Sequence, residues 1–121
     1  MWLCLNRGFL SIVESEKDPM MLKVRARKRD ILESLFPDQQ VIEDSTADYR
    51  YRVFVGREKV RECVGRMIMG EPHHPCTIDY PNFKNSVEDD ELHALYARFW
   101  GDHYAYQHRQ AHNQQQIVTT R

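Results

Sequence analysis

Two stretches decide the fold: MLKVRAR at residues 21–27 and YRYRVFV at residues 49–55. Both alternate in character from one residue to the next. In the first, the apolar positions are Leu22, Val24 and Ala26, and the basic ones are Lys23, Arg25 and Arg27. In the second, Tyr49, Tyr51, Val53 and Val55 share one face, and Arg50, Arg52 and Phe54 the other. A period of two is typical of strands with one buried face and one solvated face. We expect these strands to be neighbours in the centre of a sheet.

The segments between and after these strands predict two helices and two short strands. Apolar residues at helical spacing predict a helix around Ile31–Phe36, which Pro37 ends. A second helix is predicted over Arg57–Met69, with one apolar stripe formed by Val60, Cys63, Val64, Met67 and Ile68. Short strands are expected at Gln39–Asp44 and Cys76–Tyr80. From Met21 onward the order is therefore that of a ferredoxin-like βαββαβ sandwich.

The two ends of the chain add a hairpin and a long helix to this order. Trp2–Leu5 and Phe9–Glu14 predict two strands joined by a turn at Asn6–Gly8, where the glycine can take a positive φ. Ser86 is the expected N-cap of a helix from Val87 to about His108. Its expected buried stripe consists of Leu92, Leu95, Tyr96, Phe99, His103 and Tyr106. We expect one α+β domain over residues 1–109 and a flexible polar tail over 110–121.

Composition limits the class of protein. The chain has 121 residues, 41% of them hydrophobic, and a net charge of −1, values that exclude an intrinsically disordered chain. No apolar run reaches the roughly 18 residues of a membrane-spanning helix. The three cysteines form no CxxC pair, which favours a reducing compartment and predicts a cytoplasmic protein.

The basic face of the two central strands is the first candidate site. Its residues are Lys23, Arg25, Arg27, Arg50, Arg52 and Phe54. Cations beside an aromatic ring are typical of surfaces that bind single-stranded nucleic acid. The same face is the expected contact with a protein or ribonucleoprotein partner. The alternative is a solvated sheet face whose arginines pair with carboxylates such as Glu14 and Glu43.

A histidine and cysteine set is the second candidate. His73, His74 and Cys76 share a loop, and His108 lies one helical turn before His112. Imidazole and thiolate groups at tetrahedral geometry bind zinc, but this spacing matches no zinc signature. Loop and surface histidines are the alternative, and we expect no cofactor.

Two further features have a structural and a functional interpretation. In Ile78–Lys84, the acidic, phenolic and amine groups of Asp79, Tyr80 and Lys84 suggest acid–base chemistry, whereas the turn formed by Pro81 and Asn82 suggests a structural role. In the last helix, Trp100 and Tyr104 form an exposed flank for a homodimer or a partner, or pack against the N-terminal hairpin.

Two parts of the sequence carry a resemblance: the opening Met1–Trp2 with GFLSIV at residues 8–13, and IDYPNFK at residues 78–84 with Leu95, Tyr96 and Trp100. Through these residues most of the chain resembles a family of short uncharacterised bacterial and phage proteins. The resemblance implies no activity and no catalytic residue. It does imply a mobile-element accessory role, such as that of an anti-CRISPR-like inhibitor.

Three hypotheses follow from the sequence. The first is a non-enzymatic binding protein that uses the basic face to contact a protein or ribonucleoprotein partner. The second is a single-stranded nucleic-acid-binding domain using the same face, which a strong salt dependence would distinguish. The third is a metal-dependent enzyme, which would require the histidine and cysteine set.

Overall fold

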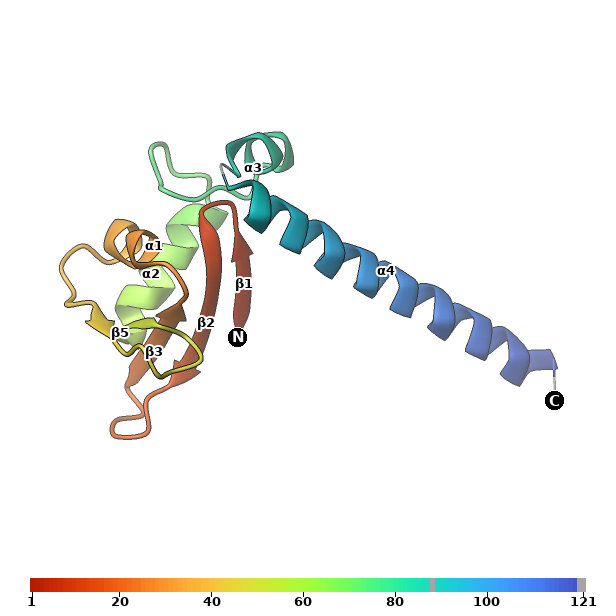
Figure 1. The fold of residues 1–121 in the computed structure, drawn as a ribbon, viewed down its shortest axis with the longest axis horizontal. Helices are drawn as coiled ribbons and strands as arrows, with labels where there is room; N and C mark the ends of the chain where they lie inside the picture. The colour runs from red at the N-terminus through yellow and green to blue at the C-terminus, as the bar shows by residue number, and fades with distance from the viewer. Residues whose placement is uncertain (88, 120–121) are drawn as a thin grey trace. The chain divides into compact units, whose positions relative to one another are not determined.

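The computed structural model describes residues 1–87 and 89–119, without the side chains of Tyr80 and of residues 115–119. The chain divides into two compact units, residues 1–88 and 89–121, and we describe each by itself. The first unit contains all the described strands and the second contains one long helix (Figure 1). The mixed α+β class predicted from the sequence is thus confirmed. None of the described helices combines the length and the apolar character needed to cross a membrane.

The first unit is built on a five-stranded antiparallel sheet. Its strands are β1 (Trp2–Leu5), β2 (Gly8–Glu14), β3 (Met21–Ala26), β4 (Ile42–Glu43) and β5 (Tyr51–Gly56). They lie in the order β1-β2-β3-β5-β4. The prediction that the two alternating stretches are neighbours in the sheet is confirmed, because β3 pairs with β5 along six residue pairs.

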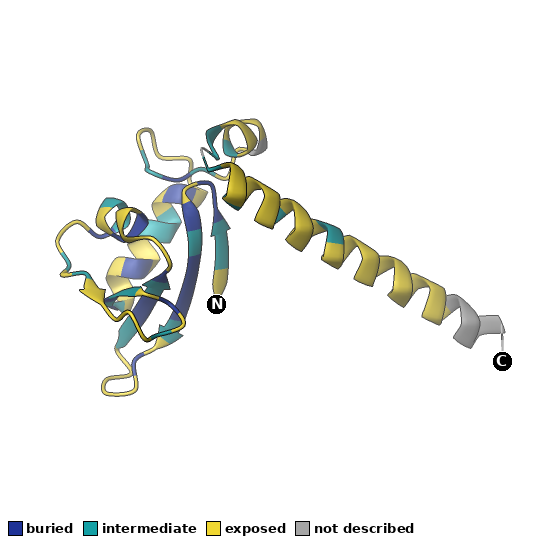
Figure 2. Ribbon diagram, in the orientation of Figure 1, coloured by how far each residue is buried: buried dark blue, intermediate teal, exposed yellow. Residues whose placement is uncertain are grey.

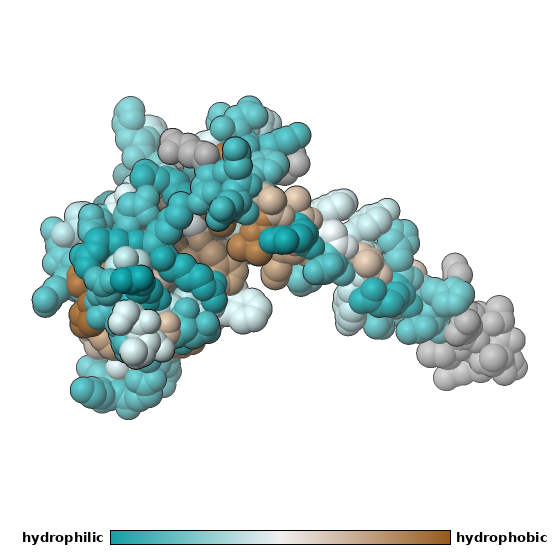
Figure 3. All heavy atoms as spheres, in the orientation of Figure 1, coloured by the Kyte–Doolittle hydropathy of each residue, from teal (hydrophilic) through white to brown (hydrophobic). Residues whose placement is uncertain are grey.

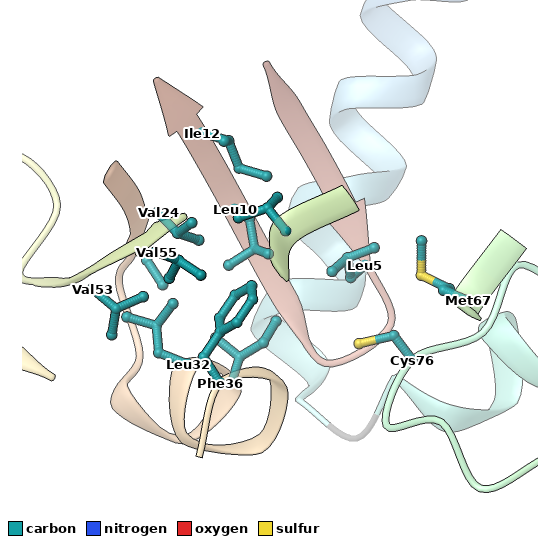
Figure 4. Close-up of a cluster of buried hydrophobic side chains, with 13 residues drawn as sticks. Leu5, Leu10, Ile12, Val24, Leu32, Phe36, Val53, Val55, Met67 and Cys76 are labelled. Carbon is teal, nitrogen blue, oxygen red and sulfur yellow. The ribbon is translucent and has the colours of Figure 1, made fainter. Parts of the chain in front are cut away.

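The apolar face of β3 and β5 is the floor of the core. Val24 lies opposite Val53 and neither is exposed to solvent. Helices α1 (Arg29–Leu35) and α2 (Arg57–Ile68) both contact β3 and β5. Figure 4 shows Leu32 and Phe36 pointing at the central valines, while Leu5, Met67 and Cys76 extend the cluster. Of the apolar stripe predicted for α2, Val60 and Met67 are buried, but Ile68 is 59% exposed.

The N-terminal hairpin extends the sheet, as predicted from its two apolar runs and the turn between them. Leu5 and Gly8 face each other across the turn, with Gly8 at φ +157°. A Cβ atom added to Gly8 would lie 3.1 Å from Ile31 Cδ1, so the glycine also allows the turn to approach α1 closely. Buried residues are concentrated in β2, β3 and β5 (Figure 2).

The predicted strand at Cys76–Tyr80 is wrong. Residues 76–79 have no regular secondary structure, and Tyr80 begins the short helix α3 (Tyr80–Ser86). The physical reason is that β2 already pairs with the free edge of β3. The N–H of Thr77 instead donates to Asn6 Oδ1 at 3.2 Å, so this segment is held by the hairpin turn.

The second unit is the helix α4 (Asp90–Thr119). Ser86 is the last residue of α3 and not the predicted N-cap. Asp89 takes that role, because its Oδ1 accepts from the N–H of Glu91 at 2.9 Å and of Leu92 at 3.3 Å. The helix continues through the segment predicted to be a flexible tail; its flexibility stays a prediction, and Thr120 and Arg121 lie outside the described residues.

Candidate functional site

Two arginines face each other at the centre of the sheet, on the face opposite the core. Arg25 in β3 is the direct cross-strand partner of Arg52 in β5, and Lys23 is the partner of Phe54. The neighbouring cross-strand pair, Val24 and Val53, points to the other face because side chains alternate along a strand. The sequence correctly placed these four residues together.

The arginine pair is only partly satisfied by its surroundings. Arg25 Nη2 donates to Ser11 Oγ at 2.7 Å, and Arg52 Nη2 donates to the carbonyl oxygen of Tyr49 at 2.9 Å. The Nε atoms of both arginines are buried and have no hydrogen-bond acceptor among the residues that the structure describes. No carboxylate of a described residue forms an ion pair with either guanidinium.

Tyr49 completes this site. The guanidinium carbon of Arg25 lies 4.6 Å from the centre of its ring, and that of Arg27 lies 4.3 Å away. Tyr49 is buried, at 7% exposure, but it was predicted to share the core face with Tyr51. That prediction is wrong because β5 begins only at Tyr51, so alternation does not extend to residue 49. We call Arg25, Arg27, Arg52 and Tyr49 the arginine cluster.

The other predicted cations are engaged elsewhere. Lys23 Nζ lies 2.8 Å from Glu16 Oε1, and its side chain is only 11% exposed. This hydrogen bond lowers the pKa of Glu16 below its usual value. Arg50 Nε lies 2.8 Å from Glu43 Oε1, and its guanidinium lies near the ring of Tyr51, which packs against the core. Arg50 therefore lies apart from the arginine cluster.

The remaining contacts around the cluster are weak or peripheral. Arg27 forms a long ion pair with Asp48, at 3.7 Å between exposed side chains. Asp44 carries a lowered pKa, mainly because Thr46 donates to it, with a minor contribution from the charge of Arg52. Neither carboxylate lies within ion-pair distance of the Arg25–Arg52 pair among the described residues.

The charges of the Arg25–Arg52 pair make this site suited to binding an anion. Like charges directly opposite on neighbouring strands repel each other and destabilise a sheet. A carboxylate or phosphate placed between the two guanidiniums would relieve that repulsion and supply the missing acceptors for both Nε atoms. The cluster is thus suited to hold a compact anionic group.

The histidine and cysteine set has a structural arrangement. His74 Nδ1 accepts from the N–H of Cys76 at 3.0 Å, and Nε2 lies 3.0 Å from the carbonyl oxygen of Cys63. Both ring nitrogens therefore bind the backbone. Burial raises the pKa of the Cys76 thiol to about 11. In the described part of the chain, no group of three or more His, Cys, Asp or Glu side chains is placed to hold a metal ion.

His73 lies apart from this arrangement, at the edge of a surface cavity. His73 has a left-handed backbone with φ +67° and lines an open cavity of about 380 Å³ between the end of α1, α2 and the loop at 71–75. The charged side chains there bind one another, as in the pairs Lys59–Asp38 and Arg66–Glu71. His108 belongs to α4, in the second unit.

The segment Ile78–Lys84 is a turn that leads into a helix. Asp79 Oδ2 accepts from Asn82 Nδ2 at 2.7 Å, and the N–H of Asp79 donates to Thr77 Oγ1 at 3.1 Å. Asp79 precedes the first residue of α3, where its carboxylate organises the first turn. These contacts support the structural interpretation of the segment.

The aromatic rings on one flank of α4 contact one another in succession along the helix. Trp100 and Tyr104 stack with ring centres 5.1 Å apart and planes at 10°, and Tyr104 meets His108 edge-on at 4.4 Å. Trp100 is 68% exposed. The role of this flank as an interface stays a prediction.

Two members of the site were missed in the sequence. Ser11 is fully buried on the arginine face, where a small hydroxyl residue in an otherwise apolar strand was the available signal. Tyr49 was predicted on the apolar face of its strand, and no pattern indicates that a residue preceding a strand folds over the opposite face.

No protein-family model, no curated protein and no solved structure matches this chain. The resemblance to short bacterial and phage proteins therefore stays a prediction, and no residue role is transferred from another protein. The assignment of the site rests on the charges and hydrogen bonds of this chain alone.

Proposed function

We propose that this protein is a non-enzymatic binding protein whose arginine cluster receives an acidic segment of a partner protein. The observation that supports this most strongly is the Arg25–Arg52 pair, with two buried Nε donors that find no acceptor in the described part of the chain. A buried donor without an acceptor costs about 1–3 kcal/mol, and the like-charge contact adds to that cost. A bound carboxylate group removes both penalties at once.

The geometry favours a compact anion over an extended polyanion. Lys23 is held by Glu16, and Arg50 is held by Glu43 away from the cluster. Tyr49 is only 7% exposed and two guanidiniums lie within 4.6 Å of its ring centre, so a base has little room to stack on it. What is left is a small group of guanidiniums, whose fork geometry matches carboxylates and isolated phosphates.

Single-stranded nucleic acid is the second candidate ligand. Phe54 favours it, because this half-buried residue lies on the arginine face directly across from Lys23 and two residues after Arg52 in β5. A base stacked on Phe54 would place its phosphate near Arg52. Binding of this kind would weaken strongly with salt, in proportion to the number of phosphates neutralised.

The experiment is affinity capture from host lysate with the full chain, with and without nuclease. Three proteins are compared: the wild type, the double variant Arg25→Glu/Arg52→Glu, and the matched control Arg50→Glu. We expect a protein partner that survives nuclease, is lost with the double variant and is retained by the control. Capture that disappears with nuclease would favour nucleic acid, and equal capture by all three proteins would contradict both proposals.

Two finer proposals accompany this one. The partner is a component of a host defence complex, an idea supported only by the resemblance to phage proteins, and the identity of the captured protein decides it. The second finer proposal concerns the fold: the segment from β3 to α2 corresponds to the first five elements of a ferredoxin-like fold. In place of the sixth element, β2 pairs with β3. The strand order supports this correspondence.

A further inference from the structure

The helix α4 has an apolar face that nothing else in its unit covers, within the residues the structure describes. Its 30 residues include Phe99, Tyr106 and Leu95, exposed by 41%, 56% and 48%. A single helix in water gains little stability from its backbone alone, and most helices depend on packing of an apolar face. Figure 3 shows hydrophobic residues among the hydrophilic ones along α4.

The apolar residues of α4 follow the repeat of a two-helix coiled coil. The seam residues are Leu92, Tyr96, Phe99, His103 and Tyr106. Their spacing alternates between four and three residues, which is the spacing of the a and d positions in a heptad. Trp100 lies at the border of this seam, on the opposite side from the charged flank described next.

The charges beside the seam are ordered in sequence. Glu91, Arg98, Asp102 and Arg109 are spaced by seven, four and seven residues, so they share one flank of the helix. Asp102 and Arg109 take the g positions next to the seam, and Glu91 and Arg98 take the c positions one step further from it. Their signs alternate along it: acidic, basic, acidic, basic. None of the four side chains forms an ion pair with a residue that the structure describes.

This order of charges matches a second copy of the helix running in the opposite direction. In an antiparallel pair, the flank of one helix faces the same flank of the other. Glu91 then faces Arg109 of the second copy, and Arg98 faces Asp102. Both pairings have the same centre, at residue 100, so one alignment satisfies all four charges in each copy. In a parallel pair, the acidic first turns at residues 89–91 would lie side by side and repel each other.

We infer that the protein forms a homodimer through an antiparallel pairing of two α4 helices. The seam residues are buried between the copies, and the two Glu91–Arg109 and two Arg98–Asp102 pairs set the direction. This inference stands independently of the arginine cluster, which lies in the other unit.

The test is sedimentation equilibrium on the full chain. The wild type is expected to be a dimer, and Phe99→Glu a monomer with unchanged circular dichroism of the sheet unit. Ile68→Glu is the matched control, since it changes an exposed aliphatic residue outside α4 and should leave the dimer intact. A wild type that stays monomeric up to about 1 mM, the weak end of specific association, would overturn the inference.

Charge reversal tests the antiparallel direction. Arg109→Glu removes two exposed ion pairs, so the dimer dissociation constant should rise by about 2- to 30-fold. The double variant Glu91→Arg/Arg109→Glu restores both pairs in reversed polarity, and the dissociation constant should return toward that of the wild type. If the double variant is as weak as Arg109→Glu or weaker, the antiparallel pairing is wrong, even when Phe99→Glu disrupts the dimer.

Discussion

The two faces of the central strands carry residue pairs that are neighbours in the chain and opposite in character. Val24 and Val53 face each other on one side, fully buried beneath Leu32 and Phe36. One residue away along each strand, Arg25 and Arg52 face each other on the other side, and their Nε donors have no acceptor among the described residues. The first pair stabilises the sheet. The second opposes it, and our proposal is that these arginines serve a ligand and not the fold.

The largest expected effect lies on the core face. Leu32 is completely buried, so Leu32→Ala should lower the free energy of unfolding by about 2–5 kcal/mol through lost burial and a residual cavity. Denaturant unfolding measures this loss. Ile78→Ala, at a residue that is 58% exposed, should change stability by less than about 0.5 kcal/mol. Equal losses in both variants would show that the assigned core is wrong.

The cysteine at the end of the core predicts a dependence on alkaline pH. Burial raises the pKa of Cys76 from its ordinary 9.0 to about 11, so the folded chain holds the thiol proton more tightly than the unfolded chain. The free energy of unfolding should therefore be unaffected by this group below about pH 9 and should fall as the pH rises from 9 through 11.

Denaturant unfolding at about pH 8 and about pH 10.5 measures that loss. The Cys76→Ala variant should be less stable overall, but it should lose less stability between the two pH values than the wild type. Identical losses in the two proteins would mean that the thiol is not buried in the folded state.

The sequence allowed the two faces to be predicted, but not the details at the ends of the strands. Alternation placed Lys23, Arg25, Arg52 and Phe54 together, because the period of two holds wherever a strand is paired on the sheet. It failed at Tyr49 and Arg50, which precede β5 and follow the path of a bend. A side chain there is directed by local contacts that no sequence period reports.

Competition for a sheet edge explains the other error. Cys76–Tyr80 has the composition of a strand, but a strand also needs a partner with free hydrogen-bonding groups. The hairpin formed earlier in the chain occupies that edge of β3, and Asn6 then holds Thr77 by a side-chain bond. Pairing between distant segments is a property of the whole fold, so local composition alone could not decide it.

The smallest expected effect concerns Arg50, which the sequence grouped with the arginine face. Because Arg50 binds Glu43 apart from the cluster, Arg50→Glu should change the dissociation constant of the captured partner by less than about twofold. Titration of the purified partner by calorimetry measures this. A loss as large as that of Arg25→Glu/Arg52→Glu would extend the binding surface across the edge of the sheet.

The most direct measurement of the central claim is the free energy of unfolding of Arg52→Glu, taken together with its capture of the partner. The variant replaces a repulsive cross-strand pair by an attractive one, while it loses one hydrogen bond to the Tyr49 carbonyl. We predict a stability equal to or above that of the wild type, within about 1 kcal/mol, and loss of the partner. A stability lower by more than about 2 kcal/mol would contradict the account, because it would show that Arg52 is needed for the fold.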